Sequence, residues 1–229
     1  MGLTSVSVSV PGRAERLPAW AWLVAVVAAE LLLLAGYFGV TGARPTTLRY
    51  ALYPFVWMNV GVWAAIHVSA PTAVRPHRWA AAALAAAYFL ALAYLSGLVG
   101  FEFTAASGHA HGHVVGFQFT PSAPGWGPRI AYAGEAFHLA FVPYRVVGYL
   151  SLSYLLYAAL LDARASPLPG VLGVAACIGC AFPAVTPLLG GVVGGSAALT
   201  GTAAGYSVDL STAAFLAGIA LLYWRPGTR

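Results

Sequence analysis

Long apolar runs separated by short polar segments dominate the chain. These runs occupy residues 17–40, 50–69, 79–100, 143–161, 170–195 and 207–224. At about 20 residues, each run is long enough for a helix that crosses the roughly 30 Å hydrocarbon core of a bilayer. A helix satisfies its own backbone polar groups, as a segment in lipid must. The pattern therefore predicts an all-α fold, a polytopic membrane helix bundle of about six transmembrane spans.

Composition supports a membrane protein and excludes several functions. The chain of 229 residues is 60% hydrophobic and 7% charged, whereas soluble domains carry about 25% charged residues. The sequence contains no lysine, so it cannot form the Schiff base of a retinal pigment. Its arginines occur singly or in pairs, which leaves no basic patch for nucleic acid. We therefore expect the lipid bilayer, and no nucleic acid, as a partner.

The arginines also predict an orientation in the cell membrane. We interpret residues 1–16 as a cytoplasmic N-terminal tail and residues 17–229 as a single integral-membrane domain. With both termini in the cytoplasm, the inner side holds Arg13, Arg16, Arg75, Arg78, Arg164, Arg225 and Arg229. The outer side holds Arg44, Arg49, Arg129 and Arg145. The excess of arginines on the inner side, seven against four, agrees with the positive-inside rule.

One long loop, residues 101–141, lies on the outer side in this orientation, and its first part, residues 101–129, is polar. Its pieces FEF and FQF flank a tip rich in glycine and histidine, which predicts a β-hairpin on the membrane surface. We expect residues 130–141 to form an interfacial helix. Pro143 suits the first turn of the next span, and Asp209 suits the N-cap of the last one.

Histidines in this loop suggest a metal site. His109, His111 and His113 alternate with small residues, and in an extended strand alternate side chains share a face. Glu135 and His138 are three residues apart, so on a helix they lie side by side. Imidazole and carboxylate ligands suit zinc, copper, iron or nickel. The alternative is a polar surface loop that binds nothing.

The segment 170–195 holds the only cysteines, Cys177 and Cys180, before Pro183 and Pro187. On a helix both thiols face the same way, so they could bind Cu(I), exchange with a disulfide, or simply pack as small hydrophobes. The stretch CIGCAFPAVTPLLGG resembles two membrane families, the DsbD-type thiol transporters and the mercuric transport proteins. These resemblances imply thiol exchange or metal transport, respectively. The first family pairs cysteines from two helices, and this chain has no second cysteine segment.

Three more polar residues stand in apolar runs. Glu30 lies near the middle of the first run, where a carboxylate suggests proton coupling or a hydrogen bond to a neighbouring helix. Arg145 is expected to extend outwards to water. His67 lies at the inner end of the second run, so a haem shared with His138 would need ligands from opposite sides of the membrane.

From these observations we expect a protein that binds or transports a transition metal, copper first and zinc second, without catalysis of its own. The outer histidines would capture the ion and Cys177 and Cys180 would receive it, while Glu30 would carry a compensating proton. A metallochaperone or a membrane complex would be the protein partner. The alternatives are a membrane thiol-disulfide oxidoreductase and a non-catalytic accessory subunit.

Overall fold

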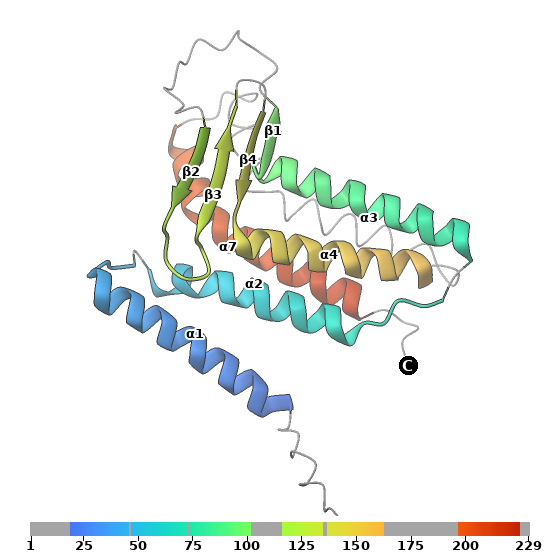
Figure 1. Ribbon diagram of the computed structural model, residues 1–229, viewed down its shortest axis with the longest axis horizontal. Helices are drawn as coiled ribbons and strands as arrows, with labels where there is room; N and C mark the ends of the chain where they lie inside the picture. Colours follow the sequence, from blue (N-terminus) through green and yellow to red (C-terminus); the bar gives the residue numbers. More distant parts are fainter. Residues whose placement is uncertain are drawn as a thin grey trace, which may run out of the picture.

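The fold combines a helix bundle with a small sheet at one of its ends (Figure 1). The computed structural model describes residues 19–45, 47–72, 74–101, 116–134, 137–162 and 197–224. Within these residues the helices are α1 (Ala19–Thr41), α2 (Leu48–His67), α3 (Arg75–Leu95), α4 (Pro143–Asp162) and α7 (Ala197–Tyr223). The strands are β1 (Val99–Phe101), β2 (Gly116–Thr120), β3 (Arg129–Ala133) and β4 (Phe137–Phe141).

The sheet overturns the predicted all-α bundle of about six spans. All four strands are antiparallel and their order in the sheet is β1-β4-β3-β2. Of the predicted FEF–FQF hairpin the structure describes Phe101 in β1 and FQF in β2, and these two strands lie at opposite edges of the sheet and do not pair. Residues 130–141 are not an interfacial helix either. They form the β3–β4 hairpin, in which the amide of Gly134 donates to the carbonyl of Phe137 at 2.9 Å.

The sequence predicted the bounds of several helices better than the structure of the loop 101–141. The first, second and fourth runs match α1, α2 and α4 to within a few residues, and Pro143 does begin α4. The third run was placed too far along the chain, since α3 ends at Leu95 and Val99 already belongs to the sheet. Asp209 is not an N-cap, because α7 begins at Ala197. The run at 170–195 and the tail at 1–16 lie outside the described residues.

The core of the bundle is built from α2, α3, α4 and α7. Trp57 on α2 is 2% exposed, and it stacks on Phe215 of α7 with ring centroids 4.1 Å apart. Its Nε1 donates to Thr212 Oγ1 at 3.1 Å, so the buried indole nitrogen is satisfied. Gly148 on α4 allows this packing, because a Cβ there would lie 2.6 Å from the Trp57 ring. Such close approach of helices at small residues is typical of membrane bundles.

The β2–β3 connection fastens the sheet to α2. Trp126 donates from Nε1 to the carbonyl of Tyr50 at 2.7 Å, and its ring packs edge-on against Tyr144 at 5.0 Å. Gly125 has a φ of +87°, and a Cβ at this position would lie 2.8 Å from Pro54. The turn therefore needs glycine both for its backbone and for contact with α2.

Three of the helices are long and apolar enough to cross a membrane. They are Ala21–Thr41 within α1, Arg75–Leu95 and Pro143–Asp162. In α7, the stretch Val208–Tyr223 is apolar but shorter. Among the described residues, α1 packs on α2 through a small cluster made of Leu34, Ala51 and Phe55. The rest of the α1 surface is mostly apolar and exposed, which indicates association with a membrane.

Candidate functional site

The strand ends farthest from the bundle are the points from which the segments with predicted metal ligands leave the sheet. We call Phe101, Gly116, Ala133 and Phe137 the distal end of the sheet, because each is the terminal residue of its strand on the side away from the helices (Figure 1). Phe101 pairs with Phe137, and Gly116 pairs with Ala133. The ends of all four strands therefore lie together, although residues 102–115 separate two of them in the sequence.

Four of the seven predicted ligands belong to segments that join these strand ends in the sequence. His109, His111 and His113 belong to residues 102–115, which join Phe101 to Gly116, and Glu135 belongs to the segment between Gly134 and Phe137. These four residues lie outside the described residues, as do Cys177 and Cys180. Among the residues that the structure describes, no group of three His, Cys, Asp or Glu side chains could hold a metal.

His138 is the predicted ligand that the structure places. It is the second residue of β4, and it pairs with Ala133 on one side and Gly100 on the other. Its half-buried ring lies across Gly100, since a Cβ there would be 2.1 Å from the His138 Cε1 atom. Only glycine leaves room for the imidazole at this position. His138 is thus held one residue inside the distal end, but Glu135 and His138 do not share a helix as predicted.

Glu30 takes part in a separate interaction between α1 and α2. Its Oε2 accepts a hydrogen bond from Asn59 Nδ2 at 2.8 Å. The predicted bond to a neighbouring helix is therefore present, and it satisfies the carboxyl group that α1 carries in its middle. Proton coupling through Glu30 stays a prediction.

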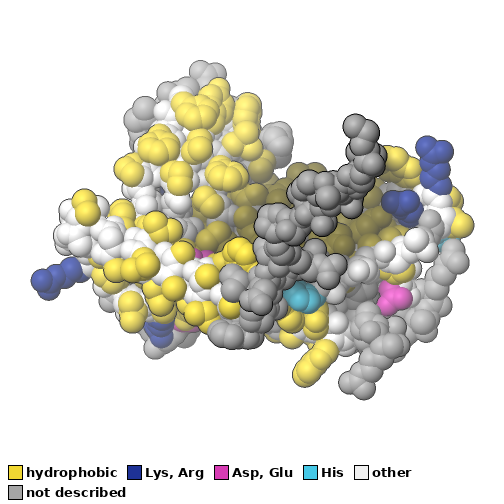
Figure 2. Space-filling model, turned by 60° about the horizontal axis from the view of Figure 1, so that its bottom comes forward, with side chains coloured by type: hydrophobic (Ala, Val, Ile, Leu, Met, Phe, Trp, Pro, Cys, Tyr) yellow, Lys and Arg dark blue, Asp and Glu magenta, His cyan; other side chains and the backbone are white. Residues whose placement is uncertain are grey.

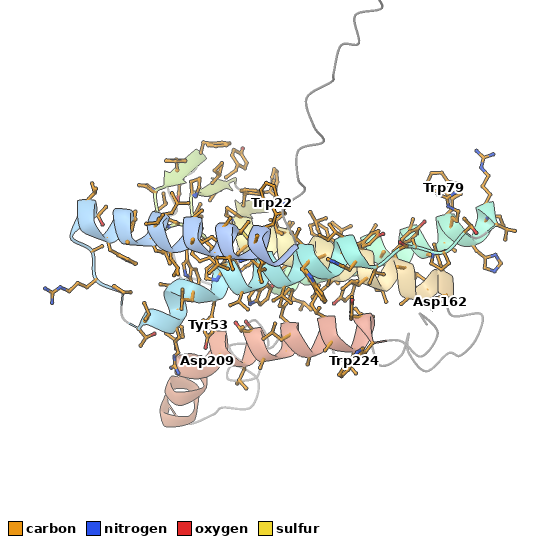
Figure 3. All side chains as sticks on the ribbon, turned by 90° about the horizontal axis from the view of Figure 1, so that it is seen from below. Trp22, Tyr53, Trp79, Asp162, Asp209 and Trp224 are labelled. Carbon is orange, nitrogen blue, oxygen red and sulfur yellow. The ribbon has the colours of Figure 1, made fainter. Side chains whose placement is uncertain are left out.

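A polar cluster at the sheet end of the bundle escaped the sequence reasoning. Asp209 on α7 accepts hydrogen bonds from Tyr53 and from Tyr50, the latter at 3.4 Å. Arg49 Nη2 lies 3.4 Å from the same carboxylate. Figure 3 shows Tyr53 and Asp209 close together where α2 and α7 meet. The spacing of Arg49, Tyr50 and Tyr53 at the start of α2 was the available signal, because residues three or four apart share a helix face.

The remaining predicted residues are placed as follows. Arg145 does not extend outwards to water. It donates to the carbonyl of Ser96 and to Tyr144 Oη, each at 3.0 Å, so it joins the start of α4 to the end of α3. His67 ends α2 at the end of the bundle opposite the sheet (Figure 1). His67 and His138 therefore lie far apart, too far to be ligands of one haem.

The chain belongs to a family of unknown function (DUF7546), whose family model matches residues 4–229. Neither a curated protein nor a solved structure matches the chain.

Proposed function

We propose that the chain is a multi-pass protein of the cell membrane that binds a transition metal ion, copper first, at the distal end of its sheet. The observation that supports this most is topological. Four strand ends come together there, and the segments with His109, His111, His113 and Glu135 all begin or end at them. His138 is fixed one residue away from the same end.

The exposure of α1 supports the membrane part of the proposal. Leu32 is 73% exposed, Leu33 is 61% exposed and Val40 is 89% exposed. In water, an apolar surface of this extent would drive association, whereas lipid solvates it without cost. Its 23 residues span about 35 Å at 1.5 Å each, enough to cross the hydrocarbon core.

The donor atoms of the predicted ligands suit a copper or zinc ion. Four histidines and one glutamate offer nitrogen and oxygen donors, which suit Cu²⁺ and Zn²⁺ in their usual coordination. His138 contributes a ring whose position the sheet fixes, and the histidines at 109, 111 and 113 supply the others. In this proposal Cys177 and Cys180 receive the ion within the membrane as Cu(I), which thiolates prefer, after a one-electron reductant from outside the chain has converted Cu²⁺ to Cu(I). Glu30 carries the compensating proton.

Electron paramagnetic resonance of the purified full chain loaded with one equivalent of Cu²⁺ tests the coordination. We expect nitrogen hyperfine structure from at least two imidazoles, and we expect it to change when His109, His111 and His113 are replaced by alanine. A spectrum identical to that of copper in the buffer would contradict the proposal.

A further inference from the structure

One face of the sheet is apolar throughout its described strands. Residues opposite each other in neighbouring strands lie on the same face, so the register places Phe117, Tyr132 and Leu139 in one row. Phe119, Ile130 and Phe141 form the next row. We call this surface the aromatic face; its strongly exposed members are Phe117, Phe119, Tyr132, Phe137, Leu139 and Phe141.

The aromatic face is open, unlike the sheet faces of most small domains. Phe117 is 77% exposed and Phe119 is 64% exposed. The opposite face carries different residues, among them Gln118, Thr120 and His138. Alternation therefore places the large hydrophobic residues on one face and the polar residues on the other. Gln118 and Thr120 are exposed as well, so what sets the aromatic face apart is its apolar composition.

The aromatic face lies on the same side of the molecule as α1. Figure 2 shows hydrophobic side chains gathered over the sheet and along α1 on the same side of the molecule. In Figure 3 the sheet and α1 lie on one side of the bundle and α7 on the other. In Figure 1 the strands run across the direction of the helices, beside the end where α1 finishes. The sheet thus stands at one end of the helices that could cross a membrane.

We propose that the aromatic face of the sheet lies in the interfacial layer of the same bilayer that the helices cross. The inference rests on the membrane placement under the proposed function, but it does not depend on metal binding. It assigns lipid, at the boundary of headgroups and acyl chains, as the occupant of this face.

Two observations favour lipid over a protein partner. Within the described strands the aromatic face carries no charged side chain and its exposed members are five aromatic rings and a leucine, a composition suited to the interface of a membrane. The face also lies on the same side of the molecule as α1, whose exposed leucines and valines the proposed function assigns to lipid.

The edge position of β2 bears on the depth of the sheet. Within the described part of the sheet, β2 pairs only with β3. Backbone groups are satisfied by water at the interface but need protein partners in the hydrocarbon region. An edge strand therefore fits the interfacial layer better than the hydrocarbon core.

The test uses the full native chain in vesicles of phosphatidylcholine that contain a lipid with a photoactivatable diazirine high on its acyl chain. After illumination, mass spectrometry locates the lipid adducts. We expect adducts on Phe119 and Phe141, and on Leu32 and Leu33 of α1, but none on Thr120, which lies on the other sheet face. Replacing Phe119 or Thr120 by tryptophan provides a second measurement: brominated lipid should quench the added fluorescence of F119W more strongly than that of T120W.

The outcomes separate the inference from the proposed function. Adducts on α1 with none on the sheet would overturn the inference and leave the membrane placement intact. Cross-links between two copies formed by a photoreactive amino acid in place of Phe119 would also overturn it, because a second copy would then cover the face. A lack of adducts on both α1 and the sheet would contradict the membrane placement itself.

Discussion

Tyr53 on α2 donates its hydroxyl hydrogen to Asp209 on α7, a bond between residues 156 positions apart in the sequence. Tyr50 and Arg49 reach the same carboxylate from the first turn of α2. Because these groups surround one partly buried acceptor, they fix α7 against α2 at the end where the sheet is attached. This contact helps to set the position of the sheet relative to the helices.

We predict that Tyr53→Phe lowers the free energy of unfolding by about 1.5–3 kcal/mol, the usual contribution of a hydrogen bond to a charged group. Arg49 is half-exposed, so Arg49→Gln should cost less stability than Tyr53→Phe. Tyr94→Phe is the matched control, because Tyr94 is 54% exposed on α3. Denaturant titration in detergent measures all three. Equal stability of Tyr53→Phe and Tyr94→Phe would show that the bond to Asp209 contributes nothing.

The contact between Gly148 and Trp57 gives a second prediction. A methyl group at 148 would lie 2.6 Å from the buried indole, so Gly148→Ala must displace Trp57 or separate α2 from α4. We expect a loss of about 1–3 kcal/mol, as for other overpacked cores. In α1, by contrast, Gly39→Ala meets nothing within 4 Å. Thermal unfolding followed by tryptophan fluorescence should separate the two variants, and an unchanged Gly148→Ala protein would refute the close packing.

Glu30 and Asn59 should behave as a coupled pair. Glu30→Leu leaves the Asn59 amide without its 2.8 Å acceptor, and Asn59→Leu leaves the carboxyl without its donor, so each change should destabilise the attachment of α1. The double variant should lose less than the sum of the two single losses, since replacing both partners removes the unsatisfied group. A double-mutant cycle on stability measures the coupling. Strict additivity would mean that the two residues act independently.

The sequence predicted the bounds of α1, α2 and α4 well and the sheet poorly, for a physical reason. Long apolar runs such as the one in α1 have only one stable form in lipid, so their boundaries follow from hydropathy. The runs in β3 and β4 have five residues each, and a short apolar run fits a strand or a helix equally well. Their alternating large apolar residues, as in Phe137, Leu139 and Phe141, carried the strand signal.

The polar cluster could be predicted only in part. Arg49, Tyr50 and Tyr53 lie on one face of a helix by spacing alone. Their partner is on a helix near the other end of the chain, and nothing local to Asp209 distinguishes a capping residue from one inside a helix. The pairing arises from packing of α2 on α7, which the sequence of either helix does not contain.

The orientation in the membrane gives a further prediction. Ala43 lies in the exposed connection at the sheet end, and Thr72 lies in the exposed connection at the opposite end. If the sheet faces outwards, as the arginine distribution predicts, Ala43→Cys should react with an impermeant maleimide added to intact cells. Thr72→Cys should react only after lysis. The native chain, labelled in the same way, gives the background reaction of Cys177 and Cys180. The reverse pattern would place the sheet in the cytoplasm.

Metal content tests the central claim most directly. The full chain is purified in detergent after growth with copper, and bound metal is measured by mass spectrometry. The variant with alanine at His109, His111 and His113 is compared with H67A/H77A, whose histidines lie at the opposite end of the bundle. The account predicts that the native chain and H67A/H77A keep their copper while the triple variant loses most of it. Equal copper in all three proteins, or none in the native chain, would contradict a metal site at the distal end of the sheet.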